Sequence, residues 1–585
     1  MDRLLKCVAL EPCRALCARG DCLRRANSHN TSGECVHYYK VRKSGRKTIM
    51  RQLIVAVILS LFPIAVFALP SHCIVGTNVY YISQAGSDSN SQAQAKNKTT
   101  PWTHAPYMHS FMGSYSHTAG DCFVFRGNDT WNVGTTDYIV VANGGTSSSP
   151  DYYGVDQTWY SGSSWNRPLF SISGNLPNVD GNGESQVIAF NASFVTFDWI
   201  EMTGGTCSTK PVSENYFWTG SQGSIVVTNS YFHAFQPPSG GCGNTKTADG
   251  NNSGVWIYSE ISGNSDCLGA FNNNVVDGTD GSGAKGYLTI VADPAPCATF
   301  AYNVIHDVCS GIGGNFTLAH DNTIGNFGGM IGQYECASSE GIHNHALRTN
   351  NDATLYNNNL YNTEGEVISV NPQSGGPGSY IFNNILWANN ASAIDILDQG
   401  SATSGSVYIW NNTIEEQTGG DFVYGNCINL ENSIGTLSIE NEYHIFAADS
   451  QLGCILIANS PFNASGKGTV KTLVYNAAND LYQTITQANA DGYSSSQTFA
   501  YSPTSLSSPT VGIGMNLTSS WPSGIVTNDT TFTCSEGTVN GVVQSVCPAR
   551  TSNERPSSGA WDAGAYYFSN MNAPAPPTDL RGVVE

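Results

Sequence analysis

The sequence predicts an all-β protein that winds into a right-handed parallel β-helix, a solenoid closed by a cap at each end. A short phrase, in which an amide or other polar side chain precedes aliphatic residues, returns along residues 302–443. Measured between the closing residues, the interval is 26 residues from Leu360 to Leu386, then 28 to Ile414 and 29 to Tyr443. Short strands that recur at such a spacing indicate stacked repeats rather than one folded sheet.

The amide residues of this phrase are the second observation. They occupy corresponding places in successive copies: Asn303, Asn322, Asn358, Asn359, Asn383, Asn384, Asn411 and Asn412. Adjacent parallel strands lie about 4.8 Å apart, so Asn side chains at equivalent positions of successive turns can form a ladder of amide hydrogen bonds. No helical period separates the copies, which favours three short strands in each turn.

The composition is the third observation. The chain has 585 residues, of which 61 are glycine and only 12% are charged. This length exceeds the usual limit of a single hydrophobic core. The low charge argues against a disordered chain, and the shortage of helix-forming residues argues against a helical bundle. A polar, glycine-rich and strand-biased chain is typical of a secreted β-structure.

Residues 1–49 differ from the remainder, because they hold 11 of the 25 Lys and Arg residues and five cysteines. Met50 then precedes an apolar run over 53–67, which Ala68 follows. This order is typical of a secretory signal peptide, and the run is shorter than the roughly 20 apolar residues that span a bilayer. We therefore interpret 1–49 as an untranslated extension and 50–68 as a signal peptide of a protein that is secreted or held at the cell surface. The alternative is a signal anchor, with the basic residues before the run on the cytoplasmic side.

Removal of residues 1–68 would make the chain strongly acidic. It would keep 13 of 25 basic residues and 41 of 45 acidic residues, a formal charge of −28. This charge excludes an electrostatic nucleic-acid binder and argues against an anionic membrane surface. No stable membrane insertion is expected after cleavage of the signal peptide.

Twelve cysteines remain after residue 68, an even number, as disulfides in an exported protein require. Two spacings equal one turn of 27 residues, which would place the two sulfur atoms over each other. We therefore predict the disulfides Cys309–Cys336 and Cys427–Cys454. Buried free thiols are the alternative.

The chain after the signal peptide divides into four parts. Residues 69–193 begin with a strand and a polar loop and are predicted to cap the open end of the solenoid against edge pairing. The parallel β-helix is predicted over 194–475, with long insertions on one face, where solenoids build their sites. A closing region over 476–568 follows, and 569–585 form a Pro-rich tail.

Short segments at both ends of the predicted solenoid resemble the corresponding segments of a known group of proteins. The segments concerned are Tyr80-Tyr81-Ile82-Ser83 with Thr100-Pro101-Trp102 at the start, and Gly559-Ala560-Trp561-Asp562-Ala563-Gly564 at the end. Over roughly residues 78–568 the chain resembles secreted bacterial right-handed parallel β-helix proteins of the broad pectate-lyase-like superfamily. The resemblance implies the fold and export. It does not imply one activity, because a fold hosts many chemistries.

One segment gathers charge in a chain that otherwise has little. Arg348 is the sole Lys or Arg between Lys285 and Lys467, and carboxylates and imidazoles surround it in the sequence. We therefore predict a catalytic group composed of Glu335, Glu340, His343, His345 and Arg348. The residues predicted to bind substrate, one or two turns earlier, are His306, Asp307, His320 and Asp321. The alternative is that these side chains fill ladder or turn positions and satisfy backbone groups.

Two chemistries suit such a site. Carboxylates on adjacent turns stand about 5 Å apart, the spacing of retaining glycoside hydrolysis, and an offset of two turns gives the inverting spacing. The resemblance implies the other chemistry, a lyase in which carboxylates hold Ca²⁺ against an acidic sugar while Arg or Lys removes the ring proton. So acidic a chain would repel a polyuronate unless bound Ca²⁺ inverted the local field.

We therefore predict a carbohydrate-active protein, a hydrolase or a lyase, that acts as a monomer on an extracellular polysaccharide. Two other functions stay open: a non-catalytic glycan-binding or surface-adhesive β-helix, and a phage-tailspike-like protein, which the signal peptide disfavours. Nucleotide-binding loops, zinc-protease helices and Cys-x-x-Cys pairs are absent from the sequence. Ca²⁺ in the lyase alternative is thus the one cofactor expected.

Overall fold

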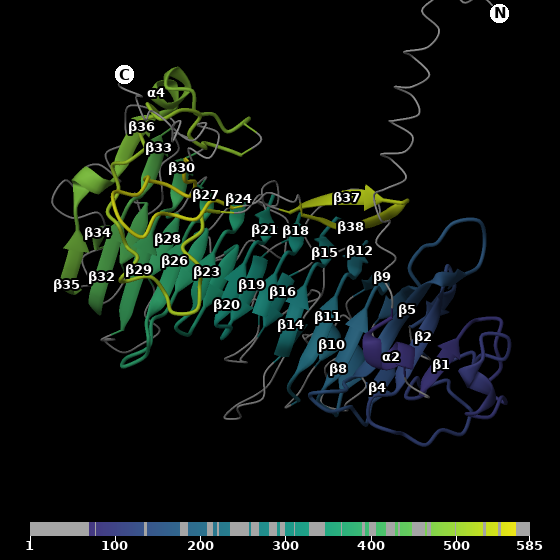
Figure 1. The fold of residues 1–585 in the computed structure, drawn as a ribbon. Coiled ribbons are helices and arrows are strands. Elements are labelled where there is room, and N and C mark those ends of the chain that lie inside the picture. The colour runs from purple at the N-terminus through teal and green to yellow at the C-terminus, as the bar shows by residue number, and fades with distance from the viewer. Residues whose placement is uncertain are drawn as a thin grey trace, which may run out of the picture. The chain divides into compact units, whose positions relative to one another are not determined.

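The structure of the chain is a computed structural model, shown as a ribbon in Figure 1. It describes residues 69–75, 78–133, 137–175, 185–206, 214–218, 222–234, 257–258, 268–279, 289–292, 299–308, 310–326, 345–363, 366–388, 392–396, 405–416, 427–430, 433–446, 463–464, 470–497, 499–530, 534–547 and 552–568. The predicted extension, signal peptide and Pro-rich tail lie outside these ranges. Within them, no helix has both the length and the apolar character needed to cross a bilayer.

The described strands wind into a parallel β-helix, in which a turn of the coil supplies one strand to each of three sheets. This confirms the predicted all-β, right-handed parallel β-helix. Sheet 1 contains, in order, β1 (Val79–Ile82), β2 (Cys122–Gly127), β5 (Asp151–Tyr160), β8 (Val195–Asp198), β11 (Ile225–Thr228), β14 (Leu268–Asn272), β17 (Thr299–Ala301), β20 (Leu318–His320), β23 (Thr354–Tyr356), β26 (Ser379–Phe382), β29 (Ser406–Trp410), β32 (Ile434–Glu440) and β35 (Val470–Tyr475).

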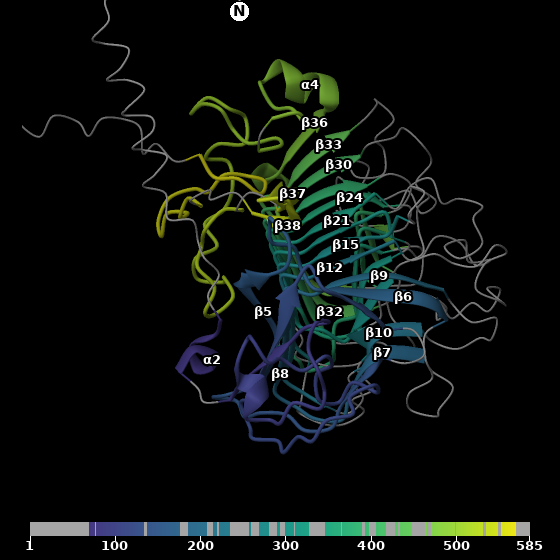
Figure 2. The same ribbon diagram turned by 90° about the vertical axis from the view of Figure 1, so that its right-hand side faces the viewer.

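Sheet 2 follows sheet 1 on each turn, and its strands form a continuous stack in the turned view of Figure 2. They are β3 (Thr130–Asn132), β6 (Leu169–Asn175), β9 (Glu201–Thr206), β12 (Tyr231–His233), β15 (Val275–Asp277), β18 (Val304–His306), β21 (Thr323–Gly325), β24 (Asn359–Thr363), β27 (Ile385–Ala388), β30 (Thr413–Glu416), β33 (Tyr443–Phe446) and β36 (Leu481–Thr484).

Sheet 3 completes the turn. Its strands are β16 (Thr289–Ala292), β19 (Ser310–Gly314), β22 (Leu347–Thr349), β25 (Ile368–Val370), β28 (Ile394–Ile396), β31 (Ile428–Leu430) and β34 (Asn463–Ala464). Earlier turns contribute a separate set whose last strand contacts β16: β4 (Ile139–Val141), β7 (Ser185–Phe190), β10 (Glu214–Trp218) and β13 (Ile257–Tyr258). The segment predicted as the N-terminal cap therefore supplies strands to all three sides of the stack.

The other described elements are short. They are α2 (Ser71–Val75), η1 (Gln94–Lys96), η2 (Ala477–Asn479), α4 (Ile485–Ala490) and the antiparallel hairpin of β37 (Ser535–Val539) and β38 (Val542–Val546).

Inward side chains of the three sheets form one hydrophobic core along the coil. Paired positions of sheet 1 illustrate it, because none of the following side chains has any exposed surface: Phe197, Val227, Phe271, Phe300, Ala319, Leu355, Ile381, Ile409 and Ile439. Alternation along each strand turns the neighbouring residues outward. The outer faces of the sheets are thus the surfaces on which a site can be built.

A corner of one residue joins sheet 1 to sheet 2 on successive turns. It has a φ between 51° and 63° at Asn229, Asn273, Tyr302, Asp321, Asn357, Asn383, Asn411 and Asn441. Asn and Asp tolerate this left-handed conformation better than other side chains with a Cβ. The first residue of each Asn-Asn doublet is therefore selected by the backbone.

The second residue of the doublet points inward and forms the predicted ladder. On each rung, Oδ1 accepts hydrogen bonds from the main-chain N–H and from Nδ2 of the Asn one turn earlier, at 2.9–3.4 Å along Asn274, Asn303, Asn322, Asn358, Asn384 and Asn412. Nδ2 also donates to a main-chain carbonyl, such as that of Ala319 for Asn358. The ladder thereby satisfies the polar groups that the corners bring into the core.

Two carboxyl groups end this ladder. Oε1 of Glu442 accepts from the main-chain N–H and Nδ2 of Asn412, at 3.0 and 3.1 Å, and the N–H of Glu442 donates to Oδ1 of Asp480 at 2.9 Å. Burial raises the pKa of Glu442 well above its ordinary value and raises the pKa of Asp480 to about 7. The carboxyl groups at the end of the ladder therefore favour their neutral forms.

The free energy of unfolding should consequently depend on Asp480. The pKa of Asp480 is about 7 in the folded protein and about 3.9 in an unfolded chain. The stability that the protonated carboxyl group contributes is therefore complete below about pH 4 and is lost as the pH rises through about 7. Asp480→Asn keeps an acceptor for the N–H of Glu442 and carries no charge. The variant should lose part of the pH dependence and be more stable than the wild type above about pH 7. Denaturant unfolding on both sides of this window measures the effect, and parallel stability curves for the two proteins would contradict it.

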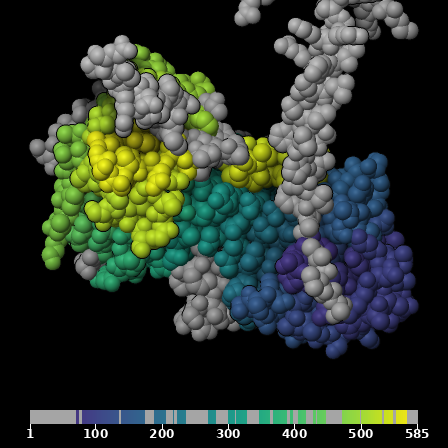
Figure 3. Space-filling model, in the orientation of Figure 1, coloured from purple at the N-terminus to yellow at the C-terminus, as the bar shows by residue number. Residues whose placement is uncertain are grey.

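The C-terminal part of the chain packs on the outer face of sheet 1. Figure 1 shows it crossing the strands in yellow-green, and Figure 3 shows its yellow atoms lying over the green part of the coil. Trp521 lies against Phe382 and Trp410, with ring centroids 4.5 and 6.1 Å away, and Trp561 lies 5.3 Å from Trp521. The buried guanidinium of Arg555 covers both Trp521 and Trp561. This aromatic cluster attaches the closing region to the coil.

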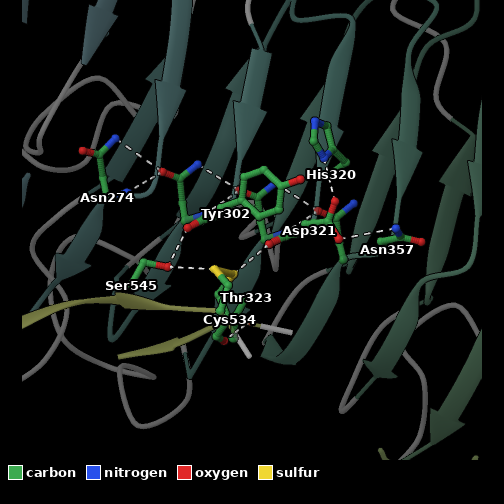
Figure 4. Close-up of a disulfide and its surroundings, with 12 residues drawn as sticks. Asn274, Tyr302, His320, Asp321, Thr323, Asn357, Cys534 and Ser545 are labelled. Atoms are coloured by element: carbon green, nitrogen blue, oxygen red, sulfur yellow. Dashed lines mark hydrogen bonds and ion pairs between the residues drawn. A yellow bond between two sulfur atoms is a disulfide. The ribbon is translucent and has the colours of Figure 1, made fainter. Parts of the chain in front are cut away.

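The β37–β38 hairpin is bonded to the corner of sheets 1 and 2 (Figure 4). Oγ of Ser545 donates to the carbonyl oxygen of Tyr302 at 2.6 Å, and Oγ1 of Thr323 donates to the carbonyl oxygen of Cys534. The disulfide Cys534–Cys547 closes the base of the hairpin. Residues of the closing region therefore reach the middle of the coil.

The described disulfides are Cys73–Cys122 and Cys534–Cys547, neither of which was predicted as a pair. Cys427 is also disulfide-bonded. Cys309, Cys336 and Cys454 lie outside the described residues, so Cys309–Cys336 and Cys427–Cys454 stay predictions.

Candidate functional site

The structure distributes the predicted site residues over three faces of the coil. Arg348 lies on sheet 3 and His345 lies two residues before the strand of Arg348. His306 and Asp307 lie at the end of a sheet 2 strand, and His320 and Asp321 lie where sheet 1 turns into sheet 2. Glu335, Glu340 and His343 lie outside the described residues. His345 and Arg348 thus lie on a different face of the coil from the four residues predicted to bind substrate.

Sheet 3 carries a row of polar side chains on its outer face. Arg348, Ser369, Asp395 and Asn429 occupy paired positions in the middle of β22, β25, β28 and β31. The residues on either side of each belong to the buried interior. Alternation along a strand therefore turns the middle residue outward. We call these four residues the sheet 3 row.

The sheet 3 row has unused hydrogen-bonding capacity. Ser369, Asp395 and Asn429 are at most 1% exposed, and Nδ2 of Asn429 donates to Oδ1 of Asp395 at 2.8 Å. Oγ of Ser369, Oδ1 of Asn429 and Nε of Arg348 are buried and have no hydrogen-bond partner within the described residues. A buried polar atom without a partner costs free energy. Such a row is suited to a ligand rich in hydroxyl groups, which can both donate and accept.

A histidine and a carboxylate precede the first two strands of the row. His345 and Glu366 each stand two residues before the paired strand residues Leu347 and Ile368, on adjacent turns. Nδ1 of His345 lies 3.3 Å from Oε2 of Glu366, and both residues are 2% exposed. The two side chains thus form a buried pair of titratable groups before β22 and β25, and both groups can move a proton.

A second cluster of titratable groups lies on the outer face of sheet 2. Nδ1 of His306 lies 2.8 Å from Asp307 and 3.9 Å from Asp277, and Nε2 lies 2.6 Å from Glu536 of the β37–β38 hairpin. Burial lowers the pKa of His306, but the hydrogen bonds to Asp307 and Glu536 and the charge of Asp277 outweigh it and raise the pKa to about 10. We call these four residues the His306 cluster.

His320 belongs to a packed stack. Its Nδ1 lies 2.7 Å from Asp321, the residue of positive φ at the corner (Figure 4). Its ring stacks on Tyr356 with centroids 4.8 Å apart, and Tyr356 stacks on Phe382. Phe382 in turn lies under Trp521 of the closing region. His320 and Asp321 therefore take part in packing and in the corner.

The described residues of these two clusters do not supply the set of oxygen ligands that the Ca²⁺ ion expected for a lyase would need. Ca²⁺ takes oxygen ligands from six to eight positions. The His306 cluster offers an imidazole nitrogen as a central ligand atom. The sheet 3 row offers a single carboxylate, Asp395, together with the cationic Arg348.

Comparison with solved structures finds likenesses to other proteins at low similarity. The GH136 lacto-N-biosidase from Eubacterium ramulus, as the native protein, is 11% identical with a TM-score of 0.41, over 67% of each chain. Its selenomethionine derivative is 12% identical with a TM-score of 0.39, over 72% of this chain and 70% of that one. Pectate lyase Pel9A is 12% identical with a TM-score of 0.38, over 84% of this chain and 96% of that one. No family model and no curated protein sequence matches the chain.

Sequence reasoning missed six residues that the structure places in these clusters: Asp277, Glu366, Ser369, Asp395, Asn429 and Glu536. A signal for the sheet 3 row exists in the sequence, since each strand reads apolar–polar–apolar or nearly so: Leu347-Arg348-Thr349, Ile368-Ser369-Val370, Ile394-Asp395-Ile396 and Ile428-Asn429-Leu430. Alignment of these triplets would have placed the four polar residues in one row. Nothing in the sequence near Glu536 indicates contact with a histidine 230 residues away.

Proposed function

We propose that the chain is a secreted glycoside hydrolase that cleaves an extracellular polysaccharide at the sheet 3 row. The observation that carries the proposal is the outward row of Arg348, Ser369, Asp395 and Asn429, in which Nε of Arg348, Oγ of Ser369 and Oδ1 of Asn429 have no hydrogen-bond partner within the described residues. Successive turns repeat at about 4.8 Å. The row of polar groups therefore follows the axis along which a linear glycan would lie, with one group on each turn.

Glu366 and Asp395 are the carboxyl pair of this proposal. They lie on adjacent turns, and Asp395 is three residues further along its strand than the position that pairs with Glu366. One strand spacing of about 4.8 Å and three residues of about 3.3 Å separate the two Cα atoms by roughly 11 Å. The proposal requires the side chain of Glu366 to turn to the outer face at the bend before β25, where strand alternation does not apply; the two carboxyl groups would then reach the separation of roughly 6.5–9.5 Å used by inverting glycosidases. One carboxyl group would protonate the leaving oxygen, and the other would activate water.

Neighbouring residues have positioning roles in the proposal. Nδ2 of Asn429 donates a hydrogen bond to Oδ1 of Asp395 at 2.8 Å, and Nδ1 of His345 lies 3.3 Å from Oε2 of Glu366. Arg348 is two turns from Asp395 and supplies the one cationic group of the row. It would donate hydrogen bonds to hydroxyl or ring oxygens of the sugar.

The charge of the chain favours a neutral glycan. The formal net charge of the full sequence is −20, and loss of the basic first 68 residues would make it more negative. A polyuronate would be repelled by such a surface. Lyase action on an acidic polysaccharide is therefore the second candidate chemistry and an outcome of the test.

The test is a panel of neutral and acidic polysaccharides incubated with the full chain from a secreting host. We expect new reducing ends from a neutral glycan, and inversion at the anomeric carbon when the first product is followed by NMR. Ultraviolet absorbance from an unsaturated product would instead identify a lyase. Retention of a glycan without any cleavage would identify a glycan-binding protein. If the protein neither retained nor cleaved any glycan of the panel, a carbohydrate-active function would be refuted.

A further inference from the structure

We infer that the His306 cluster binds one first-row divalent metal ion of the Zn²⁺ type, with Asp277, His306 and Asp307 as ligands. The cluster lies on sheet 2, whereas the proposed hydrolase site lies on sheet 3. The inference therefore stands apart from the proposed function and can be tested without a glycan.

The spacing of the three ligand atoms fits a metal ion. Nδ1 of His306 is 2.8 Å from Oδ2 of Asp307 and 3.9 Å from Oδ1 of Asp277, and the ligand atoms of the three residues all lie within 4.8 Å of one another. Zn²⁺ binds nitrogen and oxygen at about 2.0–2.2 Å, which places tetrahedral ligands roughly 3.3 Å apart. The two distances from Nδ1 bracket that value, so small side-chain rotations would complete the site.

The fold holds these residues in place. Asp277 and His306 are register partners on the adjacent strands β15 and β18, both on the outer face of sheet 2. Asp307 follows with a φ of 57°, which turns its side chain back toward the imidazole. The N–H of Thr279 donates to Asp277 at 2.9 Å, and Nδ2 of Asn326 donates to Asp307. Both carboxylates are therefore oriented before any ion binds.

Glu536 completes an outer layer of the site. Its Oε2 lies 2.6 Å from Nε2 of His306, so it accepts the proton of that nitrogen and leaves Nδ1 for the metal. A carboxylate bound to the far nitrogen of a ligating histidine is a recurrent feature of metal sites, because it fixes the ring and increases its basicity. Glu536 belongs to β37, so an ion on His306 would also fasten the β37–β38 hairpin to the coil.

The chemistry of the donors selects the class of ion. Three carboxylates surround a single imidazole, which leaves an excess of negative charge for a dication to offset. Imidazole suits Zn²⁺ and similar ions, whereas Ca²⁺ and Mg²⁺ prefer oxygen donors alone. The other compact group of ligand atoms in the described ranges contains His72, Cys73 and Cys122. Its two cysteines form a disulfide and so offer no thiolate.

Calorimetric titration of the chelator-treated full chain with Zn²⁺ tests the inference. We expect one Zn²⁺ bound per chain, more tightly than Ca²⁺ or Mg²⁺, and a rise in Tm on binding. Asp277→Asn and His306→Gln should abolish this binding and the rise in Tm. Glu536→Gln should weaken it by about 10–100-fold, as expected for a residue that acts through the ligating histidine.

His320→Gln is the matched control, because His320 also pairs with the Asp that follows it but has no second carboxylate within ion-pair distance in the described residues. It should bind Zn²⁺ as the wild type does. Absence of Zn²⁺ binding by the wild type, or equal binding by Asp277→Asn, would overturn the inference. Tighter binding of Ca²⁺ than of Zn²⁺ would overturn the assigned class of ion. Should His306→Gln fail to fold, Asp277→Asn and Glu536→Gln still decide the outcome.

Discussion

Asp395→Asn should lower the turnover of whichever polysaccharide the wild type cleaves by about 10²–10⁴-fold, the usual contribution of a general acid or base. The replacement has nearly the same shape, and its side-chain oxygen can still accept the hydrogen bond that Nδ2 of Asn429 donates at 2.8 Å. The fold should therefore persist while the charge is lost. Initial rates of reducing-end release measure the first effect, and thermal unfolding measures the second.

Glu201→Gln is the matched control for this experiment. Glu201 lies 2.9 Å from Nε2 of His233 and so forms a comparable His–carboxylate pair, but on sheet 2. This variant should turn over glycan at the wild-type rate, whereas Glu366→Gln should behave like Asp395→Asn. Full activity in both Asp395→Asn and Glu366→Gln would place the chemistry elsewhere on the coil.

The fold could be predicted because its rule is local and repeated. Each turn must pass a corner of positive φ and must satisfy the polar groups that the corner buries, and the doublet at Asn383 and Asn384 answers both needs in two adjacent residues. The repeat of that doublet is visible in the sequence. Tyr302 and Asp321 hold the same corner without Asn, which is why the pattern is fainter there.

The candidate site could be predicted only in part, because the distance between two residues along the chain does not determine whether they lie on the same face of the coil. Arg348 stood out through the scarcity of basic residues, and His345 lies two residues before the strand that carries it. His306 and His320 are 14 residues apart in the sequence, yet they end strands of different sheets. Pairing of neighbouring turns, rather than clustering of charges along the chain, decides which side chains meet.

The ladder should carry a large share of the stability, and Asn358→Ala tests it. Asn358 has no exposed surface. Its Nδ2 donates to the carbonyl oxygen of Ala319 and to Asn384, both at 3.0 Å, and its Oδ1 accepts from the N–H and Nδ2 of Asn322 at 3.1 and 3.0 Å. Truncation would leave those partners buried without hydrogen bonds, at about 1–3 kcal/mol for each unsatisfied group.

We therefore expect Asn358→Ala to lower the free energy of unfolding by about 3–5 kcal/mol, with partial relaxation of the neighbours keeping the loss below the sum of its parts. The exposed Asn143, which donates a single hydrogen bond to Tyr107, provides the control, and Asn143→Ala should change stability by less than about 1 kcal/mol. Denaturant unfolding of both variants gives the comparison. If Asn358→Ala were no more destabilising than Asn143→Ala, hydrophobic stacking alone would hold successive turns together and the amide ladder would serve only to set their register.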